Sequence, residues 1–149
     1  MYVSKENPVI QEVRSYETNL GRAYKENKIG EHRYTKTFFP TKHLITRWFN
    51  IFNQEIFRDE IYPFHEIEIK QKKGCHAEHI PFEEHCGKIY AVLSISDRFI
   101  NKNEFLFVLA HEMVHQWQWM HLYRSDHGQS FWKWKNRLAQ FEIPLSLTI

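Results

Sequence analysis

Two histidines and a glutamate stand at a spacing that can bind and use a metal ion. The segment Leu109–Trp117 reads LAHEMVHQW, in which His111, Glu112 and His115 form the pattern H-E-x-x-H. Because a helix turns by about 100° per residue, side chains four residues apart lie about 40° from each other on one face. The two imidazoles can therefore bind one ion together. Glu112 projects to one side, where a carboxylate is poorly placed as a ligand and well placed to take a proton from a water molecule at the metal.

A catalytic zinc ion needs three protein ligands and one open position, so a third ligand is expected elsewhere. His121 would match the longer pattern H-E-x-x-H-x-x-G-x-x-H, but Gln118 replaces its glycine. On a continuous helix, His121 would also point about 80° away from His111. Glu142 is a second candidate, although its neighbours do not match the second motif of the thermolysin-like class. His127 follows a polar break and precedes a glycine, so it can turn back toward the ion, and we favour it.

The motif lies in a segment with the pattern of a helix. The apolar run FLFVLA at residues 105–110 precedes it, and Asn101 or Asn103 can cap the helix start. A polar break at residues 124–128 then leads into a last helix, which we predict over Ser130–Phe141. Buried polar side chains need partners, so polar residues beside such an apolar run favour a functional motif over a chance match.

The rest of the chain predicts one helix and two strands ahead of this motif. Thr41 can cap a helix that runs to about Phe57, with apolar side chains at spacings of three and four. Phe64–Lys72 alternates between apolar and charged residues, which predicts a strand. Lys88–Ile95 is rich in β-forming residues and predicts a second strand. Gly74–Gly87, between them, is polar and predicts a loop or an irregular hairpin. This order of elements predicts an α+β domain.

Composition fits a single folded domain. The chain has 149 residues, of which 42% are hydrophobic, enough for one core. Residues 1–38 are polar and weakly periodic, so we predict an N-terminal extension there, with a helix over Pro8–Lys25, and the domain itself over residues 39–149. The net charge of +2 is too small to indicate a nucleic-acid binder.

Cysteine content and hydropathy indicate the compartment. Two cysteines, Cys75 and Cys86, are too few for a disulfide framework, and the N-terminus lacks the apolar stretch of a signal peptide. No segment approaches about 18 consecutive apolar residues. We therefore expect a cytoplasmic, intracellular protein with reduced thiols that does not cross a membrane.

The motif and the segment after it resemble a known family, the SprT-like domain. HEMVHQW at 111–117 followed by HGQSFW at 127–132 resembles the pattern H-E-M-x-H, a spacer, then H-G-x-x-F. The matching residues are His111, Glu112, Met113, His115, His127, Gly128 and Phe131. The resemblance covers roughly residues 41–141. It implies a zincin-like fold, with a small sheet beside an active-site helix, one zinc ion, and hydrolysis of peptide bonds in proteins with Glu112 as the catalytic base.

The resemblance also bears on partners. In the Spartan branch it implies cleavage of proteins crosslinked to DNA, so a protein substrate is expected and DNA is a further candidate partner. The sequence given contains no cysteine after Cys86, unlike relatives with a cysteine-paired zinc ribbon, and no long tail of interaction motifs. A different class of function is a non-catalytic, nucleic-acid-associated module in which zinc joins two helices. Glu112 argues against it, because a structural site has no use for a carboxylate there.

Three further groups of residues have both a structural and a functional explanation. Cys75, His76, His79, His85 and Cys86 could hold a second metal ion, but their spacing fits no standard zinc pattern and a polar loop is the commoner explanation. Trp117, Trp119, Trp132 and Trp134 could stack on bases, although aromatic residues spaced through helices usually belong to a core. Short basic runs such as 70–73 are mostly solvated surface.

The last strand before the motif has a predicted role in binding substrate. We expect Ile89–Ile95 to be an edge strand that pairs with an extended peptide, whose backbone would run antiparallel to it. The alternative is a central strand that is paired on both sides.

Overall fold

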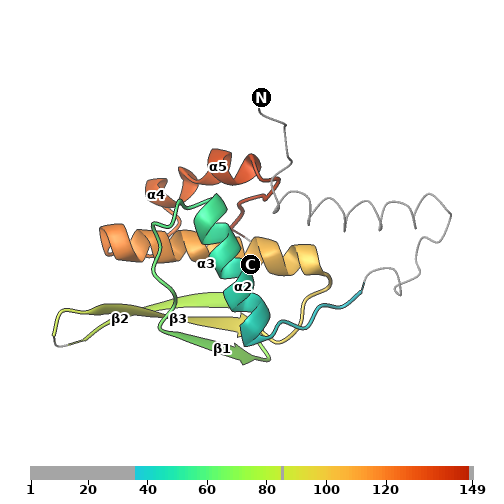
Figure 1. Ribbon diagram of the computed structural model, residues 1–149. Helices are drawn as coiled ribbons and strands as arrows, with labels where there is room; N and C mark the ends of the chain where they lie inside the picture. Colours follow the sequence, from blue (N-terminus) through green and yellow to red (C-terminus); the bar gives the residue numbers. More distant parts are fainter. Residues whose placement is uncertain (1–35, 85, 148–149) are drawn as a thin grey trace.

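The computed structural model describes residues 36–84 and 86–147 of the chain. Figure 1 shows an α+β domain in which a small sheet is covered by helices, and the predicted fold class is confirmed at this level. The elements are α2 (Lys42–Glu55), β1 (Glu66–Lys70), β2 (Ala77–Glu83), β3 (Ile89–Ser96), α3 (Lys102–Leu122), α4 (Gln129–Trp132) and α5 (Lys135–Ala139). The helix predicted over Pro8–Lys25 lies outside the described residues.

The sheet has the strand order β1-β3-β2, so β3 is its central strand. β3 pairs in parallel with β1 and antiparallel with β2. The two predicted strands are confirmed, but the prediction that Ile89–Ile95 forms an edge is wrong. Residues from both faces of β3, such as Leu93, Ser94 and Ile95, are buried, which is the burial pattern of a strand covered on both sides.

The sheet has two edge strands, β1 and β2. β2 lies in the segment that was predicted to be a loop or an irregular hairpin. Backbone bonds from Ser96 N to His76 O and from Glu84 N to Lys88 O close the two ends of the β2–β3 ladder. Because bonded and unbonded pairs alternate in an antiparallel ladder, the odd-numbered residues of β2 direct their backbone groups to the free edge. Pro81 is one of them, so its missing N–H breaks no bond to β3.

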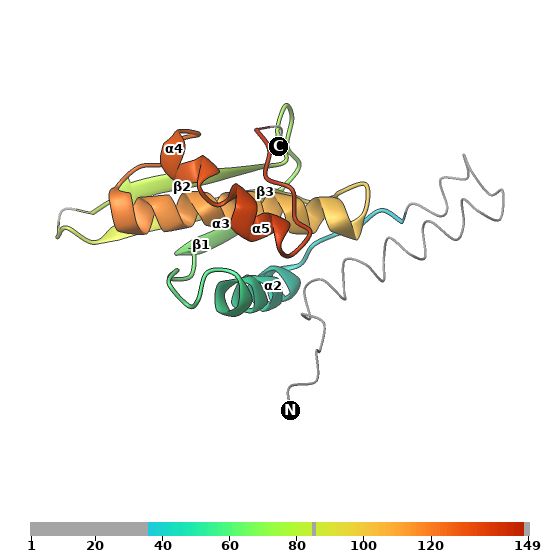
Figure 2. The ribbon, with the colours of Figure 1, turned by 90° about the horizontal axis from the view of Figure 1, so that it is seen from above.

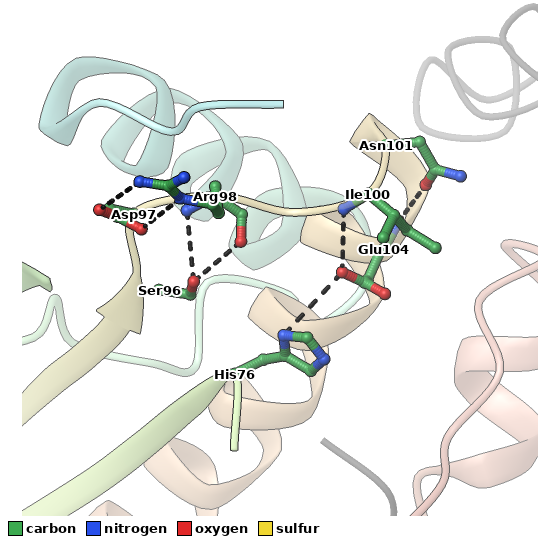
Figure 3. Close-up of polar contacts among 7 residues, drawn as sticks. All are labelled: His76, Ser96, Asp97, Arg98, Ile100, Asn101 and Glu104. Carbon is green, nitrogen blue, oxygen red and sulfur yellow. Dashed lines mark hydrogen bonds and ion pairs between the residues drawn. The ribbon is translucent and has the colours of Figure 1, made fainter. Parts of the chain in front are cut away.

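Helix α3 is the longest described element and carries the predicted motif. Asn101 caps its start by accepting a hydrogen bond from Glu104 N at 2.9 Å, and the Glu104 carboxylate accepts one from Ile100 N at 3.2 Å (Figure 3). His76, just ahead of β2, lies 3.9 Å from the same carboxylate. The helix ends at Tyr123, a residue in the left-handed region with φ 56°. Among the described residues, no helix is long and apolar enough to cross a membrane.

α3 occupies the middle of the molecule. It contacts β2 and β3 on one side and α2 and α4 on others, and Figures 1 and 2 show it running between the sheet and the C-terminal helices. α2 begins at the predicted cap Thr41 and buries Trp48 and Phe52 of its aromatic face. At the chain's first described residues, Phe38 forms a backbone bridge with Phe99. The middle of α3 is therefore enclosed, and its polar side chains have to find partners within the protein.

The last predicted helix, Ser130–Phe141, is two short helices instead of one. The backbone changes at Trp134, whose N–H bonds the oxygen of Phe131, three residues back, at 3.2 Å. This tighter turn places the Trp134 ring 4.7 Å from the ring of Phe57 and 5.3 Å from that of Trp117. Tertiary packing of a large aromatic side chain thus overrides the helical pattern.

Candidate metal centre

Three histidines converge on one point. His111 and His115 come from α3, and His127 comes from the loop that follows it. Their Nε2 atoms lie 3.2 Å apart for His115 and His111, 3.2 Å for His115 and His127, and 3.3 Å for His127 and His111. The two helical histidines are buried and His127 is exposed. This group could hold a metal ion, with one side open toward solvent.

The loop reaches back to α3 through a sharp end to the helix. Tyr123 adopts left-handed backbone angles, and three residues later the Asp126 carboxylate accepts a hydrogen bond from Gly128 N at 3.0 Å. Gly128 itself has φ −83°, so the bend does not depend on its conformational freedom. Its role is space, because a Cβ at this position would lie 3.1 Å from Asp126 Oδ1.

A buried phenylalanine lines the histidine group. Phe131 of α4 has no exposed surface, and its ring centroid lies 4.8 Å from His111, 4.9 Å from His115 and 4.8 Å from His127. An apolar neighbour on every ring keeps water from that side, which strengthens electrostatic interactions within the group. The short helix α4 therefore serves the site by placing this one side chain.

Burial keeps the helical histidines neutral. Desolvation, followed by the proximity of His115 and His127, lowers the pKa of His111 to about 3. Desolvation also lowers the pKa of His115, although a hydrogen bond with Gln118 opposes the shift. A neutral imidazole keeps a lone pair on one nitrogen, which is the form that binds metals. The rings are thus already in the protonation state that a cation requires.

Glu112 carries a buried carboxyl group beside these histidines. Its side chain is 3% exposed, and its Oε2 has no hydrogen-bond partner among the described residues. Desolvation raises the pKa of Glu112 to about 8, with Glu78 adding to the rise and Lys72 opposing it. A nearby cation would lower this pKa again, because opposite charge favours the carboxylate. An acid with one unpartnered buried oxygen, on the same helix as two neutral histidines, fits a site built around a positive ion.

The other two candidate ligands lie elsewhere. His121 makes a 2.9 Å hydrogen bond with the backbone oxygen of Glu60, and its ring lies 4.8 Å from that of Trp117. Glu142 follows α5, in the left-handed region with φ 60°. Neither residue belongs to the histidine group.

The described residues of the cysteine- and histidine-rich segment form no second metal-ligand group. It holds Cys75, His76, His79, His85 and Cys86, of which His85 lies outside the described residues. Cys75 Sγ lies 3.8 Å from a Glu78 oxygen, while Cys86 Sγ lies 3.8 Å from a Glu84 oxygen. Over residues 36–84 and 86–147, the three histidines are the sole group with metal-ligand geometry.

Two residues near the centre escaped prediction. His79 on β2 bonds Gln116 Oε1 at 2.8 Å and Ser125 Oγ at 3.0 Å, and its ring lies 6.0 Å from that of His115. In the sequence, Gln118 was noted only because it replaces the glycine of the longer histidine pattern. In the structure it makes a hydrogen bond with His115 Nδ1 at 2.8 Å. The spacing of three residues between His115 and Gln118 was a usable signal, since such neighbours meet on a helix. His79 was singled out only as part of a candidate second metal site, and its contacts with Gln116 and Ser125 could not be expected while its segment was predicted to be a loop.

No protein-family model, no curated protein and no solved structure matches the chain. What the site can do therefore follows from its residues and their geometry.

Proposed function

We propose that this chain is a zinc-dependent metallopeptidase, with the SprT-like, zincin-type arrangement that its motif resembles. His111, His115 and His127 would hold one zinc ion, and Glu112 would act as the general base. The observation that carries the proposal is the convergence of three histidine nitrogens at 3.2 to 3.3 Å, with a buried, unpartnered carboxyl oxygen on Glu112, the residue that follows His111 in α3.

The spacing of the nitrogens suits zinc. Two ligand nitrogens at about 2.0–2.1 Å from a tetrahedral ion lie about 3.3–3.4 Å apart, whereas right-angled coordination would bring them to about 2.9 Å. The observed separations of 3.2 and 3.3 Å are nearer the tetrahedral value. No fourth histidine, cysteine or carboxylate of the described residues joins the group. Three ligands with one position left over are the pattern of catalytic zinc rather than structural zinc.

The protein's own groups supply the rest of the chemistry. Zinc, when bound, would polarise the scissile carbonyl and make water easier to deprotonate. Glu112 then takes the proton from the attacking water and passes it to the leaving amine. With its pKa raised to about 8, Glu112 is mostly protonated at neutral pH, and a nearby cation would lower that pKa and favour the carboxylate that can accept a proton. Phe131 limits water on the far side of the histidines.

The free edge of β2 supports a peptide as the substrate. This strand lies against α3, and the backbone groups of Ala77 and His79 point to the edge away from β3. An extended peptide can add to such an edge through backbone hydrogen bonds that do not depend on its sequence. We propose this edge, in place of β3, as the substrate-binding strand, and proteins as substrates, including proteins crosslinked to DNA.

The test joins metal analysis to a cleavage assay. Wild type and Glu112→Gln are purified, their zinc content is measured, and each is incubated with casein and with a DNA-crosslinked protein. We expect zinc in both and a loss of turnover of about 10²–10⁴-fold in the variant, the usual contribution of a general base. Zinc in both with cleavage by neither would indicate the non-catalytic module. Equal cleavage by both would remove Glu112 from the mechanism.

A further inference from the structure

Gln118 is a buried polar side chain with one end on His115 and the other on residues that flank His127. It lies on α3, three residues after His115, and has no exposed surface. A buried amide without partners would be costly, so its contacts have to be made within the protein. Its Oε1 lies 2.8 Å from His115 Nδ1, and its Nε2 donates to Asp126 Oδ1 at 3.2 Å and to Ser130 Oγ at 2.9 Å.

The chemistry of the partners fixes which way the amide points. A carboxylate only accepts hydrogen bonds, so the NH₂ end of Gln118 has to face Asp126. The carbonyl end then faces His115, and a carbonyl also only accepts. His115 therefore carries its proton on Nδ1 and keeps its lone pair on Nε2. That Nε2 is the atom that faces the other two histidines.

The donor end of the amide holds the loop that brings the third histidine. Asp126 directly precedes His127, and Ser130 follows it by three residues. Asp126 also accepts the hydrogen bond from Gly128 N, so the carboxylate links the loop backbone to the amide. One side chain thus ties a ligand on the helix to both flanks of the ligand on the loop.

We propose that Gln118 is the positioning residue of the metal centre. It sets the tautomer of His115 and, through Asp126 and Ser130, fixes His127 at the distance from His115 that one ion requires. The proposal rests on the metallopeptidase function proposed above, but it concerns the assembly of the site and not the reaction. The proposal therefore assigns a role to Gln118, which stands where the longer histidine pattern has a glycine.

A charge swap separates positioning from packing. Gln118→Glu keeps an acceptor for His115 Nδ1 but places a carboxylate against Asp126, and the two like charges should push the loop away. Adding Asp126→Asn restores a donor and acceptor pair between the two positions. We expect zinc affinity, measured by chelator competition, to fall about 10–100-fold in Gln118→Glu and to recover in the double variant. Asp126→Asn alone keeps an oxygen that can accept from Gln118, so it should lower zinc affinity less than Gln118→Glu does. Recovery in the double variant would then show that the two changes are coupled rather than additive.

Gln116→Ala is the matched control. Gln116 is also a buried amide on α3, but its side chain hydrogen-bonds His79 and the backbone oxygen of Tyr62 instead of a candidate ligand. Removing it should lower the thermal stability about as much as Gln118→Ala does. Zinc affinity should fall in Gln118→Ala and stay near the wild-type value in Gln116→Ala.

A second readout does not need metal. In metal-free, ¹⁵N-labelled protein, histidine NMR should show His115 as the Nδ1–H tautomer, and Gln118→Leu should abolish that preference. If wild type binds zinc and the folded Gln118 variants match it in affinity and in tautomer, the positioning role is overturned while the proposed function stands. If wild type binds no zinc, the proposed function fails, and the tautomer measurement alone decides the role of Gln118.

Discussion

Two histidines after the motif differ sharply in their surroundings. His127 lies 3.2 Å from His115 Nε2, whereas His121 bonds the backbone of Glu60 on another side of α3. We expect His127→Ala to reduce zinc affinity by more than about a hundredfold. This exceeds the usual effect of losing a residue that only hydrogen-bonds a metal ligand. His121→Ala should leave it within a few fold of wild type. Chelator competition on the two purified variants measures both effects, and the reverse order would assign the third ligand to His121.

The buried acid predicts a pH dependence of stability in the metal-free protein. The pKa of Glu112 is raised from 4.5 to about 8. Between these values the folded state keeps a proton that the unfolded state has lost, so stability falls as pH rises, by at most about 1.4 kcal/mol per pH unit. Glu112→Gln should remove this slope and make the protein more stable than wild type at pH 8. Urea unfolding with a chelator present, at pH 5 and pH 8, measures it, and parallel slopes for the two proteins would contradict the shift.

At this scale the sequence shows the ligand spacing but not the polar partners. The five-residue motif is a local geometric rule, so His111, Glu112 and His115 can be identified without a structure. His127 needed the resemblance and a polar break. The partners of Gln118 lie up to twelve residues along the chain, beyond a left-handed turn at Tyr123, and only folding brings them together. The contact of Gln118 with His115 follows from helical spacing, whereas its contacts with Asp126 and Ser130 do not.

Among the elements, the strands were the hardest to predict correctly. β1 and α2 follow from apolar periodicity, while β3 and α3 follow from runs of β-forming and apolar residues. Thr41 caps α2 as expected, and Asn101, one of two candidates, caps α3. β2 lacks that pattern, because its residues AEHIPFE alternate poorly between apolar and polar and include Pro81, which is rare inside strands. Which strand lies at the edge depends on pairing partners far apart in sequence. The order β1-β3-β2 therefore had to come from the structure.

The edge position of β2 predicts an alternating response to substrate changes. Only Ala77, His79 and other odd-numbered residues direct backbone groups to the free edge, so a paired peptide would use every second residue of its own backbone. We expect a series of peptides, each with one N-methylated amide, to show a raised KM at alternate positions and little change between them. Unmodified peptide of the same sequence is the control. Equal effects at adjacent positions would contradict pairing along this edge.

For the whole molecule, metal removal should affect one region far more than the rest. The candidate ligands join α3 to the segment before α4, and the sheet contributes none. Zinc held at a hundred times its Kd adds about 2.7 kcal/mol of stability, so EDTA should lower the Tm. Hydrogen exchange should rise most over residues 123–132 and least in β1 to β3. His127→Ala should show no further response to EDTA, and a uniform rise in exchange would contradict this division.

The division of ligands between a helix and a loop has a consequence for the lifetime of the bound ion. His111 and His115 cannot part unless α3 unwinds, whereas His127 parts when the loop after Tyr123 opens, a motion of nanoseconds to microseconds in most proteins. A detached His127 stays close at a high effective concentration, so rebinding competes with escape. The pace of metal exchange would then be set by the loop. A competing chelator in solution would capture the ion while only His111 and His115 hold it. The residence time would then shorten as the chelator concentration rises.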